Sequence, residues 1–208
     1  MNSEKIKLLV VDDHAVVRVG LVALFNREAD MTVVGEAENG EQALSAIRKL
    51  SPDVVVLDFM MPKMDGAEAT AAIHAEFPDI KILILTTFGT SDGIAHALKS
   101  GATGAIQKNI SSEKLVDAIR RVAAGESVIS PEIKQSLKSE PPIPSLTEKQ
   151  KLILHSVTRG LSNREIATQF GISTNGVKDH LNAIFTKLGA SGRSEAITIA
   201  LRKHLLKI

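Results

Sequence analysis

The sequence predicts an α/β doubly wound domain with a five-stranded parallel sheet, followed by a small all-α domain. Before residue 124, short apolar segments alternate five times with segments of helical spacing. A proline-rich stretch comes next, and only helical patterns follow it. We therefore expect an α/β domain at residues 1–124, a linker at 125–145 and a helical domain at 146–208.

Five segments rich in β-branched and apolar residues are the expected strands. They cover residues 7–13, 31–37, 53–58, 80–87 and 104–108. The third is apolar at four consecutive positions before Asp58, which is typical of a strand buried on both faces. Because a helical segment separates each strand from the next, the sheet should be parallel, with helices on both faces.

Helix starts are indicated by residue pairs with the spacing of a capping box, in which a small polar residue precedes a Glu or Gln by three positions. Four pairs have this spacing: Asn39 with Gln42, Asp65 with Glu68, Thr147 with Gln150, and Ser162 with Glu165. Two of these starts lie in each expected domain.

Charge is distributed unevenly, although the net charge of the chain is only +1. Residues 1–124 hold 13 Lys and Arg against 17 Asp and Glu, whereas residues 146–208 hold 10 against 4. A small basic domain favours nucleic acid or another acidic surface as its partner. The chain has no cysteine, which excludes disulfides and thiolate metal sites. It also lacks a signal-peptide pattern and an apolar run of about 18 residues, so we expect a cytoplasmic protein without membrane association.

Charged and hydroxyl side chains stand where the expected strands end. Asp12 and Asp13 end the first strand, Asp58 the third, Thr86 the fourth and Lys108 the fifth. Ligands of open parallel sheets bind at this edge, and crowded carboxylates stay ionised only beside a cation. Mg²⁺ suits oxygen ligands, and a phosphoryl group on a nucleophilic aspartate would complete such a site. The alternative is a set of scattered turn residues, because most aspartates that follow strands have no further role.

The motifs "LLVVDDH", "VVVLDFMMPKMDG", "ILILTTF" and "GATGAIQKN" resemble, in this order, the signatures of the CheY-like receiver domain of two-component response regulators. The resemblance covers about residues 5–124 and implies a flavodoxin-like sheet. It implies that Asp58 accepts a phosphoryl group from a sensor histidine kinase. It also implies Mg²⁺ ligation by Asp13, Asp58 and the Met60 backbone carbonyl, with Asp12 acting mainly through water.

Two further roles follow from the same resemblance. Thr86 would be the switch hydroxyl, favoured over Thr87 by the motif alone, and Lys108 would bind phosphate. Receivers usually hold an aromatic residue three positions before that lysine, but this chain has Ala105. We therefore expect coupling to run mainly through Thr86, unless another ring such as Phe88 contributes. His14, which follows the acid pair, is expected to be a surface residue.

The basic domain contains a helix-turn-helix pattern in "RGLSNREIATQFGISTNGVKDHLNAIFTKLG". Projected at 100° per residue, one stripe of the second helix is apolar and should face the core. It consists of Val177, Leu181, Ile184 and Leu188. The opposite face is polar and is the candidate DNA-binding surface: Asn175, Lys178, Asp179, Asn182 and Thr186.

The whole basic domain resembles the LuxR-type helix-turn-helix of the NarL/FixJ class, on "LTEKQ", "GLSNREIA", "GIS", "VKDHL", "KLG" and "RSEA". The resemblance implies binding to double-stranded promoter DNA, as a homodimer when phosphorylated or DNA-bound. We expect Lys178 to contact phosphate or guanine, and Asn182 to reach a base edge or phosphate.

Other function classes fit the sequence less well. Phosphatases of the haloacid-dehalogenase type carry a second aspartate two residues after the nucleophile, where this chain has Met60. Neither phosphate-binding glycine motif, G-x-x-x-x-G-K-[ST] or G-x-G-x-x-G, occurs. We therefore expect no enzyme beyond self-phosphotransfer and autodephosphorylation. Ala105 leaves open a regulator of the same fold whose DNA binding does not depend on phosphorylation.

Overall fold

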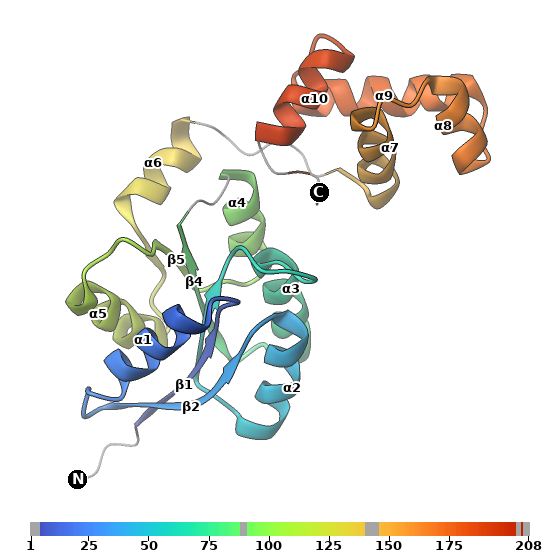
Figure 1. Cartoon of the computed structure of the whole chain (residues 1–208). Coiled ribbons are helices and arrows are strands. Elements are labelled where there is room, and N and C mark those ends of the chain that lie inside the picture. The colour runs from blue at the N-terminus through green and yellow to red at the C-terminus, as the bar shows by residue number, and fades with distance from the viewer. Residues whose placement is uncertain (1–4, 88–90, 140–145, 203–204, 206–208) are drawn as a thin grey trace. The chain divides into compact units, whose positions relative to one another are not determined.

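The structure, a computed structural model, describes residues 5–87, 91–139, 146–202 and 205. The chain divides into two compact units, Met1–Pro141 and Pro142–Ile208 (Figure 1). Each unit has a core of its own, so each is described by itself.

The first unit alternates strands and helices along the chain. Its elements are β1 (Ile6–Val11), α1 (Ala15–Phe25), β2 (Met31–Ala37), α2 (Gly40–Leu50), β3 (Val54–Asp58), α3 (Gly66–Glu76), β4 (Lys81–Thr86), α4 (Ser91–Lys99), β5 (Gly104–Gln107), α5 (Ser112–Ala123), β6 (Val128–Ile129) and α6 (Pro131–Ser139). This is the predicted doubly wound α/β architecture.

Within the described residues the sheet has six strands, in the order β2-β1-β3-β4-β5-β6, and every neighbouring pair is parallel. The predicted number of five is therefore wrong by one. The additional strand β6 consists of two residues, Val128 and Ile129, which pair with Gly104 and Ala105. A strand this short has no periodicity to detect. Gly104 permits the pairing, because a Cβ there would lie 2.5 Å from the Val128 carbonyl oxygen.

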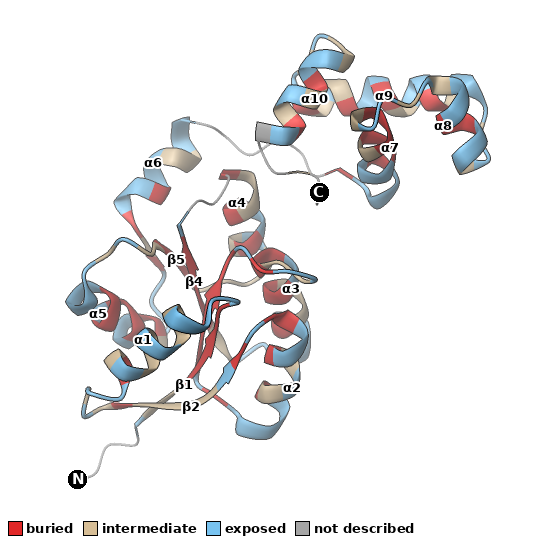
Figure 2. Ribbon diagram, viewed as in Figure 1, coloured by how far each residue is buried: buried red, intermediate tan, exposed pale blue. Residues whose placement is uncertain are grey.

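Helices cover both faces of the sheet (Figure 1). Leu8 and Val10 pack with residues of α1 and α5, whereas Leu9 and Val11 pack with residues of α2, α3 and α4. Side chains of neighbouring strand residues point to opposite faces, so β1 serves both cores. All of β3 is buried, as the apolar run before Asp58 predicts (Figure 2). The central strands therefore form a rigid mount for the residues at their carboxyl ends.

The segment expected to be a linker, residues 125–145, carries β6 and α6 in its described part. Ile133 of α6 is buried in the core on the α2, α3 and α4 side of the sheet, and Leu137 packs against the same core. The end of the segment, residues 140–145, lies outside the described residues.

The second unit is helical. It consists of α7 (Glu148–Thr158), α8 (Asn163–Phe170), α9 (Thr174–Leu188) and α10 (Arg193–Arg202). The predicted core stripe of α9 is confirmed: Val177, Leu181, Ile184 and Leu188 are its buried residues. In the described parts of both units, no helix is long and apolar enough to cross a membrane.

Three of the four predicted capping boxes are complete, at Asp65, Thr147 and Ser162. The fourth is half formed. Asn39 accepts a hydrogen bond from the Gln42 amide, but the Gln42 side chain accepts one from the Glu38 amide. All four predicted N-cap residues therefore begin helices at the expected positions.

Candidate functional site

The carboxyl end of the sheet holds the acidic residues that follow β1 and β3. Asp58 is the last residue of β3 and is only 4% exposed, and Asp12, just after β1, is 1% exposed. Strands β1 and β3 are neighbours, with Val11 opposite Leu57. Because the strands are parallel, their following carboxylates come together at one edge, as predicted.

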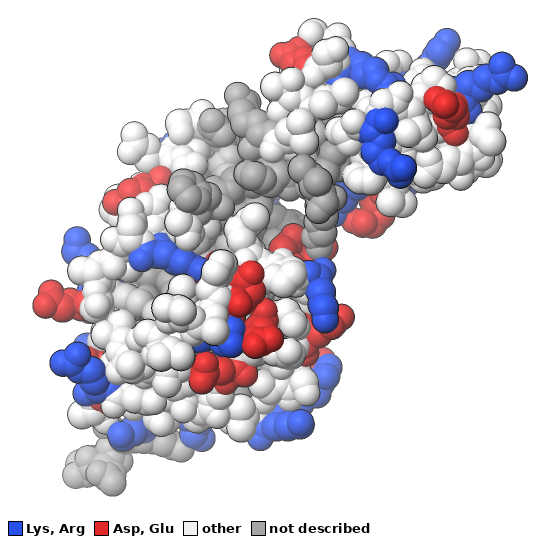
Figure 3. Space-filling view, in the orientation of Figure 1, with Lys and Arg blue, Asp and Glu red and all other residues white. Residues whose placement is uncertain are grey.

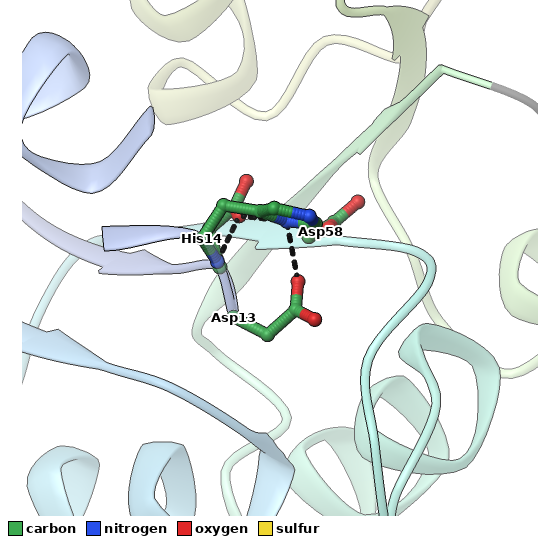
Figure 4. A group of neighbouring side chains, drawn as sticks. Asp13, His14 and Asp58 are labelled. Atoms are coloured by element: carbon green, nitrogen blue, oxygen red, sulfur yellow. Dashed lines mark hydrogen bonds and ion pairs between the residues drawn. The ribbon is translucent and has the colours of Figure 1, made fainter. Parts of the chain in front are cut away.

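Four side chains converge at this edge. One ligand atom from each of Asp12, Asp13, His14 and Asp58 lies within 4.8 Å of the others. Figure 4 shows Asp13, His14 and Asp58 turned toward one another. Asp13 and His14 are exposed, whereas Asp12 and Asp58 are buried, so the cluster opens to solvent on one side.

Lys108 joins the two buried carboxylates. Its Nζ atom lies 2.6 Å from Asp12 Oδ2 and 2.9 Å from Asp58 Oδ2. The lysine follows β5, and its amide donates to the Thr86 carbonyl oxygen at 2.8 Å, which fixes its backbone at the end of β4. The structure therefore brings residues from β1, β3 and β5 into one charged contact.

Burial and ion pairing act against each other at this contact. Burial is the largest influence on Asp58 and raises the pKa of its carboxyl above the ordinary value, and the Lys108 ammonium offsets this only partly. Burial alone would lower the pKa of Lys108, but hydrogen bonds to Asp12 and Asp58 raise it instead. The lysine is therefore held as a cation beside two carboxylates.

Thr86, the last residue of β4, has a buried hydroxyl with no hydrogen-bond partner among the described residues. Leu85 is the register partner of Asp58, so Thr86 lies one position beyond it on the neighbouring strand. Thr87, the competing threonine, is exposed. A buried hydroxyl without a partner costs about 1–3 kcal/mol, which a ligand oxygen could recover.

The loop after Asp58 is held closely against the strand ends. The Met60 amide donates to Asp58 Oδ1 at 3.4 Å, and the Met60 side chain is exposed. The Phe59 amide donates to the Leu85 carbonyl, and the Gly66 amide donates to the Phe59 carbonyl, both at 2.9 Å. These bonds fix the backbone between Asp58 and α3.

His14 is the member of the cluster that sequence reasoning placed outside the site. Its Nδ1 atom lies 2.8 Å from Asp13 Oδ1 and 3.3 Å from Asp12 Oδ1, although the ring is largely exposed (Figure 4). The sequence signal that could have placed His14 in the site is its position directly after Asp12 and Asp13. A lone histidine at a helix start gives no indication of which way its ring turns.

Position 105, where receiver domains usually hold an aromatic residue, is occupied by Ala105. Ala105 lies in β5 and is fully buried. Phe88, named above as an alternative source of an aromatic ring, lies outside the described residues. The described part of the site thus contains the threonine of the expected switch without an aromatic ring at position 105.

The donor atoms of this site fit a divalent cation such as Mg²⁺. Asp12 and Asp58 share one ammonium group, Lys108, and Asp13 adds a third carboxylate whose oxygen lies within the same 4.8 Å cluster. Three carboxylates against one ammonium leave negative charge that a cation would compensate. Hard oxygen donors, partly open to water, are the ligands that Mg²⁺ prefers.

Replacing Gly66 by Ala should destabilise the protein and disturb this site. A Cβ at Gly66 would lie 2.7 Å from Phe59 Cα and 2.9 Å from the Asp58 carbonyl oxygen, so backbone next to Asp58 must move. We expect a loss of about 1–3 kcal/mol in the free energy of unfolding, measured in urea.

The matched control is Gly20→Ala in α1, where a Cβ meets nothing within 4 Å. The free energy of unfolding of that variant should rise by roughly 0.5–1 kcal/mol, because Ala stabilises a helix relative to Gly. Equal effects of the two substitutions would show that the close approach at Gly66 is unimportant.

The second unit offers a separate polar surface on α9. All five predicted contact residues are exposed: Asn175, Lys178, Asp179, Asn182 and Thr186. Helix α9 begins after Ser173, whose side chain accepts a hydrogen bond from the Gly176 amide. Helix α8 ends at Phe170 and is capped by Gly171 in a left-handed conformation. Figure 3 shows Lys and Arg side chains on the visible face of this unit. An exposed polar helix on a basic unit suits a negatively charged partner.

Comparison with known proteins supplies two family matches. The receiver domain of response regulators matches residues 8–120, and the luxR family of bacterial regulatory proteins matches residues 144–200. The response regulator protein VraR of Staphylococcus aureus is 36% identical over 207 residues, covering 97% of this chain and 99% of the relative.

Solved structures agree with these matches. The crystal structure of the response regulator ChrA, from a heme-sensing two-component system, is 36% identical, with a TM-score of 0.58. The match covers 98% of this chain and 100% of that one. A LuxR-family response regulator from Aurantimonas sp. SI85-9A1 is 34% identical with a TM-score of 0.62, covering 66% of this chain and 98% of that one.

Proposed function

This chain belongs to the response regulators that join a receiver domain to a LuxR-type DNA-binding domain, and on that premise we propose that phosphorylation of Asp58 controls its binding to promoter DNA. We assign the phosphoacceptor role to residues 1–124 and the DNA-binding role to residues 146–208, with residues 125–145 connecting them. A sensor histidine kinase would supply the phosphoryl group. Because the partner is promoter DNA, we place the protein in the cytoplasm.

The observation that carries the proposal is the contact of Lys108 with both Asp12 and Asp58 at the end of a fully buried strand. A carboxylate oxygen of Asp58 would attack phosphorus, and the bond from phosphorus to the kinase histidine nitrogen would break. The products are an aspartyl phosphate and a free imidazole. Lys108 favours the ionised Asp58 that this attack needs, since its ammonium opposes the effect of burial.

Asp12, Asp13, Asp58 and the Met60 carbonyl would hold Mg²⁺, with Asp12 acting mainly through water. When bound, Mg²⁺ would withdraw charge from the phosphoryl oxygens. Lys108, at the carboxyl end of β5, would add a second positive charge, and it could exchange an Asp58 oxygen for a phosphoryl oxygen without leaving Asp12. Met60 stands where haloacid-dehalogenase-type phosphatases carry their second aspartate, which favours a regulator over a phosphatase.

Thr86 would report the phosphoryl group to the rest of the domain. Its buried hydroxyl has no partner among the described residues, and a phosphoryl oxygen on the neighbouring strand would provide one. Thr86 is the last residue of β4, and α4 begins at Ser91. A shift of the Thr86 hydroxyl would therefore act close to the start of α4, and a homodimer would form in response.

Helix α9 would lie in the major groove, with Asn175, Lys178, Asn182 and Thr186 facing the DNA. Asp179 lies on the same exposed face. An anion there repels phosphates unless it accepts a hydrogen bond from a cytosine amino group, so it would restrict binding to suitable sequences.

Replacing Lys178 by Ala should weaken DNA binding on all sequences. The exposed ammonium would neutralise one phosphate, so its removal should lower the slope of log affinity against log salt by about 0.9. Fluorescence anisotropy with labelled duplexes at several salt concentrations measures both effects.

The control for Lys178→Ala is Lys49→Ala, which removes another exposed charge, from α2 in the first unit. It should leave affinity and salt slope unchanged. If both variants lose affinity equally, net charge rather than the α9 surface determines binding.

Selection of bound DNA from a random pool, with and without beryllofluoride and Mg²⁺, tests the proposal as a whole. We expect a repeated half-site, recovered mainly with the phosphoryl mimic. Ala105, which stands where receiver domains usually hold an aromatic residue, leaves open a second candidate, a regulator whose DNA binding does not depend on phosphorylation. That candidate predicts the same site with equal recovery under both conditions.

A further inference from the structure

Arg18 is the one charged residue of α1, and most of its side chain is buried. Only 11% of its side chain is exposed. Its Nη1 atom donates to the backbone carbonyl oxygen of Asp12 at 2.7 Å, and Nη2 donates to Glu38 Oε1 at 3.1 Å. Its Nε atom lies 3.5 Å from Glu36 Oε2. The guanidinium therefore connects α1, the end of β1 and the end of β2.

The contact of Arg18 with the Asp12 carbonyl oxygen fixes the backbone at the point where the chain leaves β1. Strand β1 ends at Val11, so this carbonyl is the first one beyond the strand. The Asp12 amide is held by the Ala37 carbonyl oxygen at 3.1 Å, and Arg18 holds the other side of the residue. The peptide group is planar, so fixing the Asp12 carbonyl also fixes the direction from which Asp13 continues.

We propose that Arg18 is a positioning residue for the cation site: it fixes the peptide between Asp12 and Asp13, so that the exposed Asp13 carboxylate stays directed at Asp58. This inference rests on the Mg²⁺ site of the proposed function. Without the guanidinium, the Asp12 carbonyl would be free to turn toward water, and Asp13 would spend less time within reach of the other ligands. Partners that orient metal ligands typically contribute about tenfold or more in affinity.

A purely electrostatic role for Arg18 would have the opposite effect. A guanidinium near a cation site repels the cation, so removing it should strengthen binding. Two carboxylates, Glu36 and Glu38, lie against the guanidinium and offset that charge. The sign of the change in Mg²⁺ affinity therefore separates positioning from charge.

The test is Mg²⁺ binding to the full chain by isothermal titration calorimetry. We expect Arg18→Met, which keeps the length and removes the charge, to weaken binding by about tenfold. Arg18→Lys keeps the charge but loses the planar fork, and should weaken binding by a smaller factor. Unchanged or tighter binding in Arg18→Met would overturn the proposal.

The matched control is Arg48→Met. Arg48 lies on α2 and forms two exposed hydrogen bonds with Glu76, at 2.7 and 2.6 Å, away from the acidic cluster. Its Mg²⁺ affinity should equal that of the wild type. If Arg18→Met fails to fold, Arg18→Lys decides alone, because its charge is unchanged and weaker binding then reports lost positioning.

A second measurement separates this inference from the proposed function. With acetyl phosphate as donor, the Mg²⁺ concentration for half-maximal phosphorylation should rise in Arg18→Met, while the rate at saturating Mg²⁺ stays near that of the wild type. Equal half-maximal concentrations would overturn the positioning role alone. A wild type that binds no Mg²⁺, or an Asp13→Asn variant that binds it normally, would instead contradict the proposed site.

Discussion

Replacing Asp58 by Asn is expected to abolish phosphorylation of this response regulator by acetyl phosphate. The amide oxygen of Asn is a poor nucleophile, so the variant lacks the attacking group. Among the described residues, Asp58 is the carboxylate that ends the fully buried strand β3, and it lies 2.9 Å from Lys108. Intact-mass spectrometry after incubation with donor and Mg²⁺ measures the phosphorylated fraction.

The control for this result is Asp53→Asn, at the opposite end of the same strand. Asp53 directly precedes β3, at the end away from the acidic cluster, and accepts a hydrogen bond from the Lys7 amide at 2.7 Å. Its variant should be phosphorylated normally. Phosphorylation that persists in Asp58→Asn would place the acceptor elsewhere.

The same variant predicts a pH-dependent difference in stability. Burial raises the pKa of Asp58 above the ordinary value of 3.8, so the folded protein binds this proton more tightly than the unfolded chain does. Ionisation of Asp58 therefore removes stability as the pH rises from 3.8 through the raised pKa. Without Mg²⁺, Asp58→Asn should be more stable than the wild type at neutral pH, and the difference should shrink toward pH 3.8. Urea unfolding at several pH values measures it.

Replacing Thr86 by Val should separate stability from signalling. The Thr86 hydroxyl is buried without a partner among the described residues, so its removal should stabilise the unphosphorylated protein by about 1–3 kcal/mol. The same removal takes away the group that would bind the phosphoryl oxygen. Phosphorylation of Asp58 should continue, but phosphorylation-dependent dimerisation and tighter DNA binding should be lost.

Thr70→Val is the matched control for Thr86→Val. Thr70 is equally buried, but its hydroxyl donates to the Gly66 carbonyl oxygen at 2.6 Å. The identical substitution should therefore destabilise the protein by about 1 kcal/mol and leave the response to phosphorylation intact. If Thr86→Val keeps the normal response, the threonine is not the switch.

Much of the fold was predictable because it depends on local pattern. The apolar run before Asp58 predicts a buried strand, and β3 is buried throughout. The alternation of strands and helices predicts a parallel sheet, which explains why Asp12 and Asp58 meet. Strand β6 was missed because two residues carry no periodicity, and its pairing depends on the space beside Gly104.

The site was predictable only in part, for a different physical reason. Strand ends fix where a Cα atom lies, so the convergence of the acidic residues follows from topology. They do not fix where a long side chain reaches. The simultaneous contact of Lys108 with Asp12 and Asp58, the turn of His14 toward Asp13, and the contact of Arg18 with the Asp12 carbonyl all depend on tertiary packing.

The central claim is that phosphorylation of Asp58 controls DNA binding, and one titration tests it most directly. The DNA affinity of the full chain is measured on its selected site, with and without beryllofluoride and Mg²⁺, for the wild type and for Asp58→Asn. We predict that the mimic tightens binding by the wild type and has no effect on the variant. Equal affinity of the wild type under both conditions would contradict the claim.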